Sequence, residues 1–182
     1  ILPRFFASGA MSREPVVPSL SPSMDIQVSS NFERLLFELL DRDGVATAGV
    51  MKQFAKTGQF HVDESLLARA KELFSAYRLD DDGTIAEIAA TAKQNSVTLD
   101  PHSAVGVYAA RQAHADGTVS RDVSIVALAC AHPAKFDMAV TKATGAVPKL
   151  PAHLADLMKR PERQTHVSAK VEAVKSLVSD MK

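Results

Sequence analysis

The sequence predicts an α/β protein that is predominantly helical and contains a few buried strands. Two observations lead to this class. Apolar residues recur at three- and four-residue spacing through much of the chain, which is typical of helices that pack by one face. One stretch, residues 123–129, is instead continuously apolar and lies between two helical patterns, which is typical of a strand covered on both faces.

The N-terminal segment, residues 1–29, predicts loop and short extended pieces, because prolines interrupt longer regular elements. A helix is predicted after it. Ser30 and Glu33 have the spacing of a capping box, and a stripe of leucines follows.

The middle of the chain continues as helices. Residues 63–77 carry an apolar stripe with Asp63 at the position of an N-cap. Residues 80–83 predict a turn, after which Thr84 and Glu87 have capping-box spacing and open the next helix.

The last part of the chain predicts two short strands among helices. Residues 97–99 and 123–129 are the predicted strands. A helix rich in small residues is expected after Asp100, another over 133–143, and an amphipathic one over 168–181.

Composition excludes several classes of function. Lysine plus arginine and aspartate plus glutamate are equal at 21 each, which argues against a binder of nucleic acid or of anionic membranes. A single cysteine cannot form an internal disulfide, and we expect a reducing, cytoplasmic setting. The chain begins at Ile1 inside an apolar run and without an initiator methionine. This start suggests a piece cut from a longer polypeptide, and proteolytic processing would give the same start.

No metal site is predicted. The six histidines show no compact ligand spacing. The acidic stretches 41–44 and 80–83 lack the further oxygen ligands of a calcium loop, so we interpret them as turns and caps.

Three segments suggest more than packing. Residues 19–35 lead a polar, turn-rich loop into a helix N-terminus, which offers free amides to an anion. Residues 99–106 also lead a loop into a helix, whose small residues Ala104, Gly106 and Ala109 would let a neighbouring backbone or ligand approach closely. Residues 124–136 place Cys130, Ala131 and His132 just beyond the predicted strand, where α/β sheets bind ligands. Composition alone leaves Cys130 open to two interpretations, a small buried hydrophobe or a functional group.

These segments, read together, resemble the threonine synthase family of bacteria and fungi. The motifs are LSPSMDIQVSSNFERLLFELL, LDPHSAVGV and ALACAHPAKF, in the family's order. The resemblance extends over the whole chain, although residues 45–94 match in pattern more than in residues.

The resemblance implies a pyridoxal-phosphate enzyme of the tryptophan-synthase-β-like fold, fold-type II, of which this chain would be the C-terminal portion. Such an enzyme converts O-phospho-L-homoserine and water to L-threonine and phosphate. The family carries its Schiff-base lysine and its cofactor-phosphate loop in the N-terminal half. No catalytic residue is therefore expected in this segment, and that half would be its partner.

The resemblance also implies a set of site residues. The position of Cys130 is commonly a threonine whose hydroxyl binds the pyridine nitrogen of the cofactor, so Cys130 is the expected cofactor contact. Lys135 is not the Schiff-base lysine. The residues expected to line the cleft are Ser23, Asp25, Asn31, Asp100, His102, Ser103, His132 and Lys135.

The implied organisation has four parts. Residues 1–29 and 97–147 would belong to the cofactor domain, 30–96 would be a helical insertion, and 148–182 would form C-terminal helices. Two alternatives remain open from the sequence. The chain could be a non-catalytic structural or interaction fragment, or part of another fold-type II enzyme such as a serine or threonine dehydratase.

Overall fold

The computed structural model describes residues 1–181. The chain divides after Pro148 into two compact units. The first unit contains α1 (Leu2–Ser8), β1 (Ala10–Ser12), η1 (Pro22–Met24), α2 (Phe32–Leu39), α3 (Gly44–Thr57), β2 (Gln59–His61), α4 (Glu64–Leu73), α5 (Asp81–Asn95), α6 (Pro101–Ala115), η2 (Pro133–Phe136) and α7 (Asp137–Thr144). The second unit contains η3 (Ala152–Leu154), η4 (Leu157–Lys159) and α8 (Val171–Asp180).

Helices α1 to α4 pack around a small antiparallel sheet, in which Met11 of β1 lies opposite Phe60 of β2. Phe5 of α1 is fully buried in this core, and its ring lies 4.6 Å from that of Phe32. Gly9 ends α1 with a φ of 75°, a conformation that favours glycine, and its amide donates to the carbonyl of Phe5. This turn directs the chain from α1 straight into β1.

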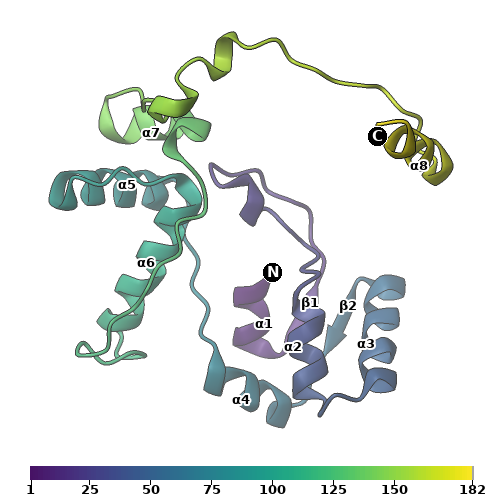
Figure 1. The fold of residues 1–182 in the computed structure, drawn as a ribbon. Coiled ribbons are helices and arrows are strands. Elements are labelled where there is room, and N and C mark those ends of the chain that lie inside the picture. The colour runs from purple at the N-terminus through teal and green to yellow at the C-terminus, as the bar shows by residue number, and fades with distance from the viewer. Residues whose placement is uncertain (182) are drawn as a thin grey trace. The chain divides into compact units, whose positions relative to one another are not determined.

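Helices α5, α6 and α7 form a second group of elements in the same unit (Figure 1). Its buried apolar side chains are aliphatic and include Ile88, Ala104 and Val140, while Glu87 and His102 are buried polar residues of the same group. Small residues let helix backbones approach closely, so this group positions the N-terminus of α6 firmly. The candidate site lies at that N-terminus.

The prediction of a buried strand over 123–129 is wrong. These residues form irregular backbone, and Val126 and Leu128 are 82% and 77% exposed. The segment returns beside α6, since Val119 donates to the carbonyl of Ala113 and the amide of Cys130 donates to Ser103. An apolar run becomes a strand only when neighbouring strands pair with its backbone, and residues 1–181 supply no such neighbour.

Three other local predictions also differ from the structure. Residues 97–99 form no strand for the same lack of a partner, and helix α1 lies where loop and extended pieces were expected. Neither predicted capping box forms. Helix α2 begins without a side-chain cap, and α5 begins at Asp81 with Asp80 as its cap. Acidic side chains in the first turn suit the positive end of the helix dipole, which explains the earlier start of α5.

Several helix predictions are confirmed. Asp63 caps α4 by accepting from the amide of Leu66 at 2.9 Å, although this helix ends at Leu73 rather than at Tyr77. Helices also follow Asp100 and Pro133 as expected.

In the second unit, α8 occupies most of the predicted C-terminal helix. The apolar stripe of α8 is exposed to solvent, and it includes Val171, Val174 and Val178. Among the described residues, no helix has both the length and the apolar character needed to cross a membrane.

Candidate functional site

The site is built around the first turn of α6. Asp100 is the N-cap of this helix, and its Oδ1 accepts from the amide of His102 at 3.0 Å. Pro101 follows at the first helical position, where its missing N–H costs nothing. The sequence Asp-Pro-His-Ser therefore places the side chains of His102 and Ser103 in the first turn, next to the capping carboxylate.

Asp100 is a buried carboxylate that is saturated with donors. Its side chain has no exposed surface, and it accepts from the amide and ring Nδ1 of His102, the hydroxyl of Ser103 and the amide of Ala131. Burial acts to raise the pKa of Asp100, but these hydrogen bonds together outweigh burial and lower the pKa below its usual value. Asp100 is therefore an ionised acceptor at neutral pH.

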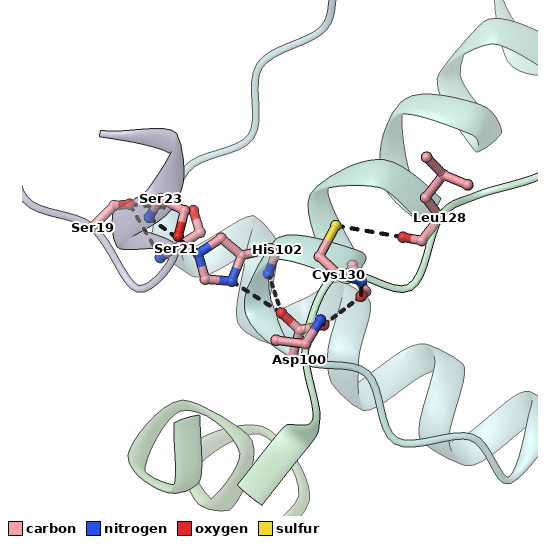
Figure 2. Close-up of polar contacts among 9 residues, drawn as sticks. Ser19, Ser21, Ser23, Asp100, His102, Leu128 and Cys130 are labelled. Carbon is pink, nitrogen blue, oxygen red and sulfur yellow. Dashed lines mark hydrogen bonds and ion pairs between the residues drawn. The ribbon is translucent and has the colours of Figure 1, made fainter. Parts of the chain in front are cut away.

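His102 connects this carboxylate to a loop from the beginning of the chain. Its Nε2 lies 3.1 Å from the amide nitrogen of Ser23, and its Nδ1 lies 3.0 Å from Oδ1 of Asp100. Figure 2 shows the ring between Asp100 and this loop, residues 19–25, which we call the serine-rich loop. The ring also packs edge-on against Phe136, with a centroid distance of 4.8 Å.

Ser103 connects the same carboxylate to Cys130. The hydroxyl of Ser103 donates to Oδ2 of Asp100, and its oxygen accepts from the amide of Cys130 at 2.9 Å. Ala131 donates directly to Oδ2 at 3.3 Å. Cys130 is exposed, and its thiol donates to the carbonyl oxygen of Leu128 at 3.6 Å. Figure 2 marks this contact with a dashed line.

The loop 19–25 is itself held by a carboxylate. Ser19 donates to Asp25 through its amide and through its hydroxyl, each at 2.7 Å. From α5, Asp81 accepts from the amide of Leu20 at 2.9 Å. A hollow of about 610 Å³ borders the loop, and Asp25 and Asp81 are among its lining residues. The loop is thus tied both to α5 and, through Ser23, to α6.

The predicted site residues divide into two sets. The structure brings together Ser23, Asp100, His102, Ser103 and Cys130 in one hydrogen-bonded cluster, with Asp25 in the adjoining loop.

The other predicted residues lie outside the cluster. Asn31 is exposed at the start of α2 and makes no side-chain cap there. His132 is exposed and caps η2, accepting from the amide of Ala134 at 3.1 Å. Lys135 lies exposed on η2 itself.

Sequence reasoning missed the roles of Asp81 and Phe136, and it placed Ala131 beyond the predicted strand without assigning it a role. Ala131 contributes through its backbone amide, for which residue type gives no signal. Asp81 holds a loop that lies 61 residues earlier in the chain, and spacing does not reveal such a contact. Only Phe136 had a sequence signal, since it directly follows the motif residues 132–135. An aromatic side chain at such a position commonly packs against another ring, here that of His102.

Within residues 1–181 no group of three or more metal-binding side chains comes together. The two acidic stretches act as helix caps instead. Asp43 caps α3 and Asp80 caps α5.

Comparison with known proteins identifies the family. The family described as "Threonine synthase, C-terminal" matches residues 103–178. The chain is 43% identical to the threonine synthase of Pseudomonas aeruginosa over 180 residues, which are 98% of this chain and 38% of that protein. The solved structure of pyridoxal-phosphate-bound threonine synthase from Brucella melitensis superposes with a TM-score of 0.86 at 43% identity. The chain belongs to the threonine synthase family.

A second solved structure, threonine synthase from yeast, has a TM-score of 0.84 at 31% identity and matches 98% of this chain. These similarities confirm the predicted fold class, the C-terminal part of a fold-type II threonine synthase, mainly helical with little sheet. They do not support the assignment to a serine or threonine dehydratase. The chain spans 38% of the length of the Pseudomonas and Brucella proteins that it matches.

Proposed function

We propose that this chain is the C-terminal portion of an enzyme that binds pyridoxal phosphate and converts O-phospho-L-homoserine and water to L-threonine and phosphate. The observation that carries the proposal is the match of 98% of the chain to a threonine synthase whose structure contains that cofactor. The remainder of the polypeptide would supply the lysine that carries the cofactor. The intact enzyme would act in the cytoplasm.

The residues of the cluster fit a neutral contact to the cofactor. The backbone amides of Cys130 and Ala131 are already taken by Ser103 and Asp100, while Cys130 is exposed and its thiol makes one long contact, 3.6 Å, to the carbonyl oxygen of Leu128. A ring nitrogen that stays weakly protonated requires an uncharged partner. A thiol meets this requirement, because it is a weak donor without a formal charge. We assign Cys130 to the pyridine nitrogen. When bound, pyridoxal phosphate supplies an electron sink for the carbanions of the reaction.

The other residues would shape the cleft around this contact. Residues 1–29 and 97–147 contribute the serine-rich loop and the first turn of α6, and we assign both to the cofactor domain. Residues 30–96 form a helical insertion, and the C-terminal helices begin at residue 148. Ser23, Asp25 and His102 would hold the wall of the cleft, because their hydrogen bonds tie the loop to α6 and to itself. Asn31, His132 and Lys135 would line its outer edge.

The proposed activity is tested with the full-length polypeptide. Purified with pyridoxal phosphate, it is expected to release one phosphate and form one L-threonine for each O-phospho-L-homoserine consumed. Phosphate is measured by a coupled colour assay and threonine by chromatography. A protein that binds the cofactor but releases no phosphate would contradict the proposal, and production of a 2-oxo acid and ammonia from L-threonine would favour a dehydratase.

A second prediction concerns Cys130 itself. In the full-length enzyme, Cys130→Thr is expected to keep most of the activity, because a hydroxyl can make the same hydrogen bond to the ring nitrogen. Cys130→Ala removes that bond, and kcat/KM is expected to fall by roughly threefold to tenfold, the usual value of one hydrogen bond. Steady-state kinetics of the three proteins make the comparison. Equal kcat/KM in all three would refute the contact.

A further inference from the structure

Asp100 does more than a helix cap requires. A cap needs one oxygen to accept from an amide in the first turn, and Oδ1 of Asp100 does so for His102. Its second oxygen, Oδ2, is directed to another part of the chain. It accepts from the hydroxyl of Ser103 and from the amide of Ala131, which lies 31 residues further along.

The hydrogen bonds of His102 fix the orientation of the carboxylate. The amide of Ser23 can only donate, so Nε2 of His102 accepts and carries no proton. The ring proton therefore lies on Nδ1 and is donated to Oδ1 of Asp100. His102 is neutral in this arrangement, and among the described residues no lysine or arginine forms an ion pair with Asp100. The charge of Asp100 is balanced by hydrogen bonds and by the N-terminus of α6.

Ser103 transmits this fixed position to Cys130. Because its hydroxyl proton is donated to Asp100, its oxygen is left to accept from the amide of Cys130. The preceding residues 123–129 are irregular and largely exposed. The backbone at Cys130 is therefore held from one side by Ser103, while Asp100 holds the next residue directly.

We propose that Asp100 is a positioning residue for the thiol of Cys130. The carboxylate, itself oriented by His102, fixes the backbone of Cys130 and Ala131 through its Oδ2. This places the thiol for its contact with the ring nitrogen of the cofactor. The inference rests on the proposed function, since it assigns the thiol to that contact.

Asparagine separates the two roles of Asp100. It caps helices as well as aspartate does, so Asp100→Asn keeps the cap when its side-chain oxygen faces the amide of His102. Its amide group, however, presents N–H donors in place of one oxygen. In one orientation it faces the donors of Ser103 and Ala131, and in the other it faces those of His102. Either orientation loses acceptors that the aspartate provides. Ser103→Ala removes the link to Cys130 and leaves the cap untouched.

The experiment uses the full-length enzyme with four variants: Asp100→Asn, Ser103→Ala, Cys130→Ala and the control Asp63→Asn. Asp63 is a matched control, because it caps α4 and accepts from a neighbouring serine hydroxyl but is exposed. Absorbance titration gives the dissociation constant of pyridoxal phosphate and the absorption maximum of the bound cofactor. Urea unfolding of the cofactor-free proteins reports stability separately.

Asp100→Asn and Ser103→Ala are expected to raise the dissociation constant of pyridoxal phosphate by about tenfold, the scale of a lost charge-assisted hydrogen bond. They are also expected to shift the absorption maximum in the same direction as Cys130→Ala. Asp63→Asn is expected to leave both values unchanged. Because Asp100 acts through Cys130, adding Asp100→Asn to Cys130→Ala is expected to cause no further shift of the maximum.

Variants of Asp100 and Ser103 that bind the cofactor with wild-type affinity and absorption maximum would overturn the inference, even if their stability falls. Asp100 would then be a structural cap only. If Asp100→Asn does not fold, Ser103→Ala decides the question alone. A wild-type enzyme that binds no cofactor or releases no phosphate would instead refute the proposed function, so the two failures are distinguishable.

Discussion

Replacing Asp100 with leucine is expected to lower the free energy of unfolding of the full-length protein by about 4 kcal/mol. Leucine has a similar shape but accepts no hydrogen bond. The substitution leaves the amides of His102 and Ala131, the ring of His102 and the hydroxyl of Ser103 without their acceptor. Leaving a buried donor unsatisfied costs about 1–3 kcal/mol, and several donors lose their partner at once here.

The matched substitution is Asp63→Leu in α4. Asp63 also caps a helix, but its partners are exposed and can turn to water instead. We expect a much smaller loss of stability, and urea unfolding followed by circular dichroism measures both variants. Equal losses for the two substitutions would show that capping alone accounts for the stabilising effect of Asp100.

Truncating Phe5 to alanine is expected to lower the free energy of unfolding by about 3–5 kcal/mol. The side chain is fully buried, and its ring packs against those of Phe6, Phe32 and Phe60. Removing it takes apolar surface from the centre of the core and leaves a cavity that the surrounding helices can only partly fill. The same unfolding measurement gives the loss.

Phe74 provides the comparison for Phe5. Its ring lies 6.2 Å from that of Phe6, but the side chain is 49% exposed. Phe74→Ala is expected to cost about 1 kcal/mol or less, because little apolar surface is removed from a packed core. A loss as large as that of Phe5→Ala would contradict the placement of the core around α1.

The helices of the chain could be predicted where their signals are local. Asp63 and Asp100 stand directly before the helices they cap, and the apolar stripes follow at regular spacing. The strands could not be predicted in this way. Residues 123–129 have the composition of a buried strand, but strand formation depends on neighbours elsewhere, and β1 and β2 have only three residues each. Ser30 and Glu33 also gave a local signal, the spacing of a capping box, but α2 begins without a side-chain cap.

The candidate site shows the same division. The turn from Asp100 to Ser103 is local, and the sequence placed it near the site. The resemblance to a family named both Ser23 and Cys130 as site residues. It did not predict the hydrogen bonds through His102, Asp100 and Ser103 that connect them. The bond from Ser23 to His102 involves a backbone amide and an unprotonated ring nitrogen. Such a contact depends on tertiary structure, because neither residue type implies the other.

The spacing of these contacts along the chain has a consequence for the order of folding. Ser23 and His102 are 79 residues apart, whereas Asp100 and Ala131 are separated by 31. Loop-closure entropy makes the longer contact more costly by about 0.8 kcal/mol. The first turn of α6 is therefore expected to capture Cys130 early, and the serine-rich loop is expected to dock last. The wall of the cleft is then completed only after the position of the thiol has been set.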